Sequence, residues 1–157
     1  MNATSAPLVR AVHGVAETQA FARSLAAAFG PSARYALEGN LGAGKTCFVQ
    51  GLCEGLGIRA AVSSPTFAIA NEYLDDASGR RFVHLDLYRL SGPDELDSIG
   101  WDDYLDAGDP MAVEWPERAV GRLPPDVIRV RIAPGPGPDD RTIEVSPPPP
   151  APQRIPA

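Results

Sequence analysis

The sequence is poor in lysine, cysteine and histidine. Its 157 residues include 14 basic side chains, of which 13 are arginine and only one, Lys45, is lysine. The 20 acidic residues give a formal net charge of −6. Because no basic excess is available to attract a phosphate backbone, direct and independent binding of nucleic acid is disfavoured.

Long apolar runs are also missing. The most apolar N-terminal stretch, residues 20–29, contains Arg23 and Ser24 and falls far short of the ~20 residues that a membrane span needs. No signal peptide is recognisable, so we expect a cytoplasmic protein without membrane association. Cys47 and Cys53 lie six residues apart on one predicted helix and cannot pair there, which fits a reducing compartment.

Proline is the one residue type in local excess. Of the 17 prolines, nine lie between Pro134 and Pro156, including the run of four at positions 147–150. A segment with few backbone donors and few large apolar side chains cannot offset its ordering entropy. We therefore predict one folded domain over residues 1–145 and a disordered, proline-rich tail over residues 146–157.

Apolar periodicity predicts an alternation of helices and strands. Thr18 resembles a helix cap and begins a helical pattern that Gly30 and Pro31 stop. The predicted helices cover residues 18–29, 45–56 and 93–99, and the predicted strands cover residues 34–38, 67–74, 81–90, 111–115, 127–132 and 142–145. This order indicates an α/β fold with a mixed, mostly parallel sheet flanked by helices and extended by antiparallel strands.

Residues 39–46 read GNLGAGKT and match the phosphate-loop pattern G-x-x-x-x-G-K-S/T between a predicted strand and a predicted helix. Gly39, Gly42 and Gly44 allow the backbone N–H groups to turn inward around phosphate oxygens. The sole lysine of the chain would reach the β- and γ-phosphates, and the Thr46 hydroxyl would bind Mg²⁺. The motif predicts a P-loop NTPase.

ATP is the expected nucleotide, because a guanine-reading N-K-x-D element needs a second lysine that the chain lacks. Two acids end apolar strands and are candidates for the metal side of the site: Asp86 in VHLDLYR and Glu114 in MAVEW. Thr66, in the segment SSPT, is placed where a switch loop would sense the γ-phosphate. His84 is interpreted as an ordinary strand histidine.

Residues 94–109 contain seven acids and no basic residue. Such a run is usually a solvated face. With Trp101 and Tyr104 interleaved, an acidic docking surface for a basic protein is the alternative.

Several strings, in this order and at these intervals, resemble one family. GNLGAGKT, SSPTF, HLDLYRL and VEWPER are similar to the TsaE or YjeE family, the small bacterial ATPases of tRNA threonylcarbamoyladenosine biosynthesis. The resemblance covers about residues 18–145. It implies a P-loop α/β fold, binding of ATP with Mg²⁺, and association with TsaB and TsaD homologues, with tRNA involved only indirectly. Hydrolysis would reset the transferase between turnovers.

Carried over residue by residue, the resemblance gives a set of site residues. The implied catalytic residues are Asp86 and Glu114, and the implied metal ligands are Thr46, Asp86 and Glu114. The expected nucleotide-binding residues are Thr18, Gly39, Asn40, Leu41, Gly42, Ala43, Gly44, Lys45, Thr46, Thr66 and Trp115. Thr18 and Trp115 are assigned near the base and beside the metal-side glutamate.

Two departures from the family pattern are Cys47, in place of a second hydroxyl residue, and Gln50, where relatives commonly carry arginine. Two alternative functions stay open. A small-molecule kinase would use the same phosphate loop, but only about 30 residues remain after the metal-side strand for an acceptor pocket and a lid. A non-hydrolysing assembly module would use ATP only to stabilise a docking conformation.

Overall fold

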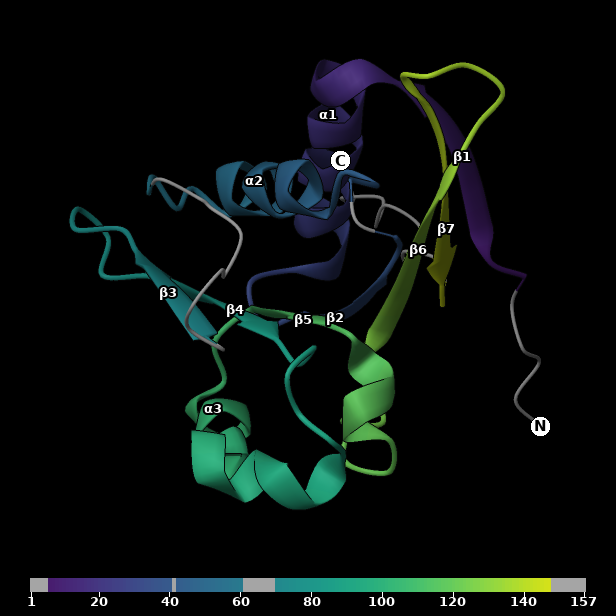
Figure 1. Ribbon diagram of the computed structural model, residues 1–157. Helices are drawn as coiled ribbons and strands as arrows, with labels where there is room; N and C mark the ends of the chain where they lie inside the picture. The colour runs from purple at the N-terminus through teal and green to yellow at the C-terminus, as the bar shows by residue number, and fades with distance from the viewer. Residues whose placement is uncertain (1–5, 41, 61–69, 148–157) are drawn as a thin grey trace.

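The computed structural model describes residues 6–40, 42–60 and 70–147. Its centre is a seven-stranded sheet in the order β1-β7-β6-β2-β5-β4-β3 (Figure 1). The four central strands, β6, β2, β5 and β4, are parallel, and the pairs at both ends of the sheet are antiparallel. The strands are β1 (Leu8–His13), β2 (Arg34–Glu38), β3 (Ala70–Leu74), β4 (Arg81–Asp86), β5 (Met111–Glu114), β6 (Ile128–Pro134) and β7 (Asp140–Ser146).

Helices cover both faces of the sheet. On one face lie α1 (Gly14–Phe29) and α2 (Lys45–Gly55), and on the other lie α3 (Trp101–Ala107) and the 3₁₀-helices η1 (Pro93–Ile99) and η2 (Pro116–Ala119) (Figure 1). The larger core cluster lies between the sheet and helices α1 and α2, and every strand contributes buried residues to it. The smaller cluster lies on the opposite face, where β4 and β5 pack against η1, α3 and η2. The predicted mixed α/β sheet is confirmed.

Two glycines allow α2 to lie close against α1. A Cβ atom added at Gly51 would stand 2.5 Å from the carbonyl oxygen of Gln19, and one at Gly55 would stand 2.8 Å from that of Arg23. Any side chain at either position would push the helices apart. Because α2 begins at Lys45, this packing fixes the helix that carries the end of the glycine-rich loop.

Strand β4 differs from its expected form. The predicted alternation is present, since Phe82 belongs to the core beneath α1 and α2, while Val83 and Leu85 belong to the core on the opposite face. Both faces are covered, so four consecutive residues of the strand are buried. The strand ends at Asp86 rather than at residue 90, because the chain then forms a turn in which the amide of Leu90 donates a 3.0 Å hydrogen bond to the carbonyl of Leu87.

The N-terminal helix begins one turn earlier than predicted. Helix α1 starts at Gly14, and the expected cap Thr18 instead lies inside the helix, where its hydroxyl donates a 3.1 Å hydrogen bond to the carbonyl oxygen of Gly14. Such a bond to the residue four positions earlier satisfies a buried hydroxyl within the helix. The cap prediction was wrong.

Strand β1 and helix α3 were not predicted. Strand β7 extends to Ser146, and the predicted tail lies outside the described residues from position 148 onward. The domain and tail boundaries therefore stay predictions. Both cysteines are free thiols, as expected. Within the described segments, every helix is too short or too polar to cross a membrane.

Candidate functional site: a phosphate-loop cleft

The loop between β2 and α2 needs glycine at three positions for two reasons. Gly42 and Gly44 have φ angles of 81° and 103°, in the left-handed region that side chains disfavour. A Cβ at Gly39 would stand 2.9 Å from the backbone oxygen of Ile132 on β6. The amide of Ala43 donates a 2.9 Å bond to the carbonyl of Asn40, which closes the turn. Two of the glycines are therefore required by the local backbone conformation, and the third by the close approach of β6.

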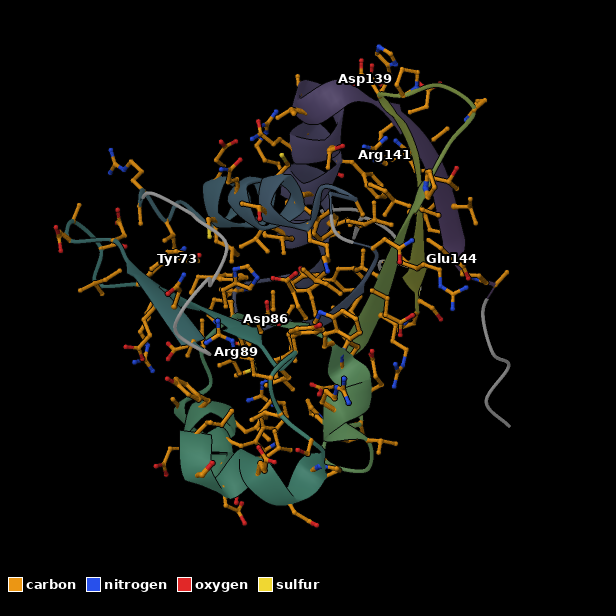
Figure 2. The ribbon with its side chains drawn as sticks, in the orientation of Figure 1. Tyr73, Asp86, Arg89, Asp139, Arg141 and Glu144 are labelled. Carbon is orange, nitrogen blue, oxygen red and sulfur yellow. The ribbon has the colours of Figure 1, made fainter. Side chains whose placement is uncertain are left out.

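Two acids face the loop from adjacent parallel strands. Asp86 ends β4 and Glu114 ends β5, and the strand register makes them direct partners. Because the carboxyl ends of parallel strands share one edge of the sheet, both carboxylates reach the side where the loop emerges from β2. Figure 2 shows Asp86 near the centre of the molecule, where β4 ends.

A cleft of about 670 Å³ brings most of the predicted residues together. The predicted residues in its lining come from the loop, the start of α2 and the ends of β4 and β5. Cys47 and Tyr88 line it as well. Its lining consists of Gly42, Gly44, Lys45, Thr46, Cys47, Asp86, Tyr88, Glu114 and Trp115. Residues far apart in the sequence thus form one surface around the end of the loop.

A second cleft of about 370 Å³ shares Lys45 and Trp115 with the first. It accounts for two more predicted residues, because Gly39 and Asn40 form part of its lining. The remaining lining comes from the end of β2, the start of η2 and the end of β6: Leu37, Glu38, Pro116, Glu117, Arg131, Ile132, Ala133 and Pro134. The glycine-rich loop therefore borders both clefts.

Lys45 and Glu114 form a largely buried ion pair. The Lys45 Nζ atom lies 3.1 Å from Glu114 Oε1, and the two side chains are only 11% and 6% exposed. The other carboxylate oxygen, Oε2, accepts a 2.8 Å hydrogen bond from Nε2 of His84. Burial raises the pKa of Glu114, but the His84 bond and the Lys45 charge outweigh burial and hold that pKa below its ordinary value. Glu114 is therefore ionised at neutral pH.

Trp115 adopts an unusual backbone conformation between the ion pair and η2. Its φ of 57° makes it the sole non-glycine residue with positive φ in the described part of the chain, and an L-residue held there costs about 1–2 kcal/mol. The indole ring lies 4.9 Å from the Tyr88 ring, and the Lys45 Nζ atom lies 6.0 Å from its centroid. This strain sets an aromatic wall directly beside Lys45.

Not every predicted residue joins the clefts. Thr18 is buried within α1 and lines neither cleft. The Ala43 side chain packs into the core beneath the loop. Leu41 and Thr66 lie outside the described residues, so the predicted roles of both, and the switch segment around Thr66, stay predictions.

Arg141 is a contributor that sequence reasoning missed. Its Nε donates a 3.1 Å hydrogen bond to the carbonyl of Ala43, and its Nη2 lies 3.4 Å from the carbonyl of Gly42. Figure 2 shows Arg141 on β7, at the end near α1. Arg141 is far from the loop in the sequence, and no motif surrounds it. Its hydrogen bonds to the loop carbonyls are therefore apparent only in the folded structure.

The acidic segment is partly neutralised by arginines from elsewhere in the chain. Arg122 contacts Asp97 and Asp102 at 3.0 and 3.3 Å, and Arg81 contacts Asp109 at 2.6 Å. The Arg81 pair connects the acidic segment to β4, and the Arg122 pairs connect it to the segment that follows η2. The alternative of a docking surface stays a prediction.

A strand, a glycine-rich loop and a helix, with two carboxylates from neighbouring parallel strands, define this molecule as a protein with a P-loop α/β fold. The family model described as threonylcarbamoyl adenosine biosynthesis protein TsaE matches residues 12–143. The chain belongs to the TsaE family.

Individual relatives agree with this assignment. The TsaE protein of Bacillus subtilis is 40% identical over 127 residues, which cover 81% of this chain and 77% of the relative. That of Streptomyces coelicolor is 47% identical over 97 residues, 61% of this chain and 65% of the relative. That of Haemophilus influenzae is 41% identical over 96 residues, and the match spans only 60% of its length.

A solved structure shows the same architecture. The crystal structure of Bacillus subtilis YdiB superimposes with a TM-score of 0.69 at 34% sequence identity, covering 92% of this chain and 87% of that one. The family and the P-loop fold implied by the sequence motifs are both confirmed.

Proposed function

We propose that this chain binds and hydrolyses ATP with Mg²⁺, as the subunit that supports threonylcarbamoyladenosine modification of tRNA together with TsaB and TsaD homologues. Modification would occur at N6 of the adenosine next to the anticodon, with tRNA contacted by the partners rather than by this acidic chain. The observation that carries the proposal is the 670 Å³ cleft, which gathers Lys45, Thr46, Asp86 and Glu114 around one loop.

The cleft is suited to polyphosphate. The loop brings backbone amides and the N-terminus of α2 to one place, and both attract anions. Lys45 adds a compact charge that is largely shielded from solvent. In such surroundings an ion pair or hydrogen bond to phosphate is stronger than it would be in water.

The donor set fits Mg²⁺ bound together with phosphate. Among the residues described, no group of three or more His, Cys, Asp and Glu side chains is placed to hold a metal alone. Mg²⁺ does not require such a cage, because it keeps several waters and takes one or two carboxylates plus substrate phosphates. Thr46, Asp86 and Glu114 supply one hydroxyl and two carboxylates in the same cleft. When bound, Mg²⁺ would neutralise charge that develops on the phosphates.

Glu114 is the better candidate for orienting the attacking water, because Lys45 and His84 hold its ionised carboxylate in the cleft, where it can accept a hydrogen bond from that water. Asp86, half-buried beside it, is the better candidate for the metal. Among the described residues that line the 670 Å³ cleft, none is an arginine. Since an arginine finger accelerates phosphoryl transfer strongly, we expect slow hydrolysis by the chain alone and faster hydrolysis with its partners.

The decisive experiment measures phosphate release from Mg·ATP by the purified chain, with and without purified TsaB and TsaD homologues. Release that rises with the partners supports the proposal. Tight ATP binding with no release under any condition would instead identify a non-hydrolysing assembly module. Phosphoryl transfer to a small acceptor in a substrate screen would identify a kinase.

Lys45→Ala should abolish measurable Mg·ATP binding, or weaken it at least about tenfold, because it removes a charged hydrogen-bond donor from the cleft. Calorimetry measures the affinity, and circular dichroism checks that the fold is retained. Arg23→Ala is the matched control: it also removes one positive charge, but from an exposed pair with Glu54 on α2. Unchanged affinity in Lys45→Ala would refute the assignment of the phosphate loop.

Glu114→Ala should bind Mg·ATP but lose hydrolysis by about 100-fold or more, as expected when a group that accepts a proton is removed. Asp106→Ala, which removes an exposed acid on α3, is the control and should hydrolyse ATP like the parent chain. Wild-type turnover in Glu114→Ala would exclude Glu114 from the chemical step.

A further inference from the structure

His84 belongs to a buried chain of polar groups that ends at Glu114, in the wall of the 670 Å³ cleft. Its side chain has no solvent exposure, and its Nε2 lies 2.8 Å from Glu114 Oε2. On the other side of the ring, Nδ1 lies 3.4 Å from the hydroxyl of Tyr73 on β3. His84 lines neither of the two clefts, so it is one layer removed from any ligand.

The strand register explains how His84 reaches Glu114. On β4, His84 and Asp86 are two residues apart and therefore point to the same face of the sheet. His84 pairs with Ala112 of β5, and Asp86 pairs with Glu114. His84 is thus the diagonal neighbour of Glu114, within reach of a long side chain.

The two oxygens of Glu114 have different partners. Oε1 is held by Lys45, and Oε2 is held by His84. Lys45 is the residue that would turn to the phosphates of ATP, whereas His84 is fixed on a central strand with no access to the cleft. When Lys45 turns, the His84 bond remains as the hydrogen bond to this carboxylate from the part of the chain that the structure describes.

We propose that His84 is a positioning residue for ATP hydrolysis: its Nε2–H holds Glu114 Oε2, so that Oε1 stays aimed into the cleft after Lys45 engages phosphate. This inference rests on the proposed function, because it assigns a role within the same reaction. A buried histidine that orients a functional carboxylate acts as an outer partner, whose loss typically costs ten- to a hundredfold in activity.

The hydrogen-bond network fixes which ring nitrogen carries the hydrogen. An ionised carboxylate only accepts, so Nε2 must be the donor to Glu114. In the neutral ring, Nδ1 is then an acceptor, which suits the hydroxyl of Tyr73 as its donor. Tyr73 thereby favours the tautomer that Glu114 requires.

A purely structural role for His84 makes a different prediction from a positioning role. In His84→Gln, the side-chain amide can present an N–H close to the place of Nε2, whereas His84→Met fills similar volume without a donor. If His84 only fills space, both variants behave alike. If it positions Glu114, His84→Gln retains most of the kcat and His84→Met loses about ten- to a hundredfold, while the Kd for Mg·ATP in both stays within about threefold of the parent value.

A second measurement needs neither ATP nor turnover. Nitrogen-15 NMR of the nucleotide-free chain should show His84 protonated at Nε2, with a hydrogen-bonded Nε2–H signal that is lost or displaced in Glu114→Leu. Detection of this Glu114-dependent signal supports the inference even if His84→Met folds poorly. A His84 ring protonated only at Nδ1, or a signal unaffected by Glu114→Leu, would overturn it.

The kinetic outcomes separate this inference from the proposed function. If the parent chain binds and hydrolyses Mg·ATP, wild-type kcat in His84→Met, or equal losses in the two His84 variants, overturns the positioning role alone. If the parent chain fails to hydrolyse ATP with its partners present, the proposed function is overturned and the positioning role with it.

Discussion

Gly51→Ala is a substitution for which helix propensity and tertiary packing predict opposite results. Alanine is favoured over glycine inside a helix by about 1 kcal/mol, so from propensity alone the variant should be more stable. In the folded protein, however, the new Cβ would stand 2.5 Å from the Gln19 carbonyl oxygen and 2.7 Å from the Ala22 Cβ. Neither contact can be relieved by rotating a flexible side chain.

The magnitude follows from these two terms. Relieving the contacts requires α1 and α2 to move apart, and overpacking of this kind typically costs 1–3 kcal/mol, with backbone contacts toward the upper end of about 3 kcal/mol. Subtracting the helix-propensity gain leaves a net loss of about 1–2 kcal/mol. For a domain of this size, that loss lowers Tm by roughly 2–8 °C.

Thermal and urea unfolding followed by circular dichroism measures this effect. The matched control is Gly92→Ala, because Gly92 has extended backbone and an added Cβ there meets nothing within 4 Å. That control should be neutral or up to about 1 kcal/mol more stable, through lower entropy of the unfolded chain. A Gly51→Ala variant as stable as the parent chain, or more so, would refute the packing argument.

Two further predictions concern the support of the loop and one surface pair. Arg141→Met should raise the Kd for Mg·ATP about three- to tenfold, since it removes donors to the carbonyls of Gly42 and Ala43; calorimetry showing unchanged affinity would contradict this. The 2.6 Å contact with Asp140 raises the pKa of His13 above 6.5 and lowers that of Asp140 below 3.8. The contribution of His13 to the free energy of unfolding is lost as pH rises through its raised pKa. The contribution of Asp140 is lost as pH falls through its lowered pKa. The pair should therefore stabilise the fold most between about pH 4 and 6.5. An NMR titration in which Asp140→Asn leaves the His13 pKa unchanged would exclude this coupling.

Short-range patterns predicted the two elements that flank the loop and one distant 3₁₀-helix. Strand β2 and 3₁₀-helix η1 have the predicted bounds, and α2 begins at the predicted Lys45. In each case the determining signals lie within a few residues: an apolar run, a glycine with positive φ, or a proline at the start of a helix. These signals act before tertiary contacts form, which is why they can be read along the chain.

Elements with weaker local signals were missed or misjudged. Helix α3 has only seven residues, and three of them are acids whereas only Trp101 is buried, so its sequence is typical of a solvated loop. Strand β1 has a buried residue only at Val12 and is held by its pairing with β7 near the other end of the chain. Such pairing cannot be inferred from the strand's own residues.

For the site, the phosphate loop with its lysine and threonine, and the two acids at strand ends, could be predicted from sequence patterns, because each depends on residue type and on position within one element. The contacts of Glu114 with both Lys45 and His84, and those of Arg141 with the loop, become visible only in the folded chain. These contacts depend on the register between strands and on the approach of segments distant in sequence. A side chain's partner across a sheet is set by that register, which no single stretch of the chain encodes.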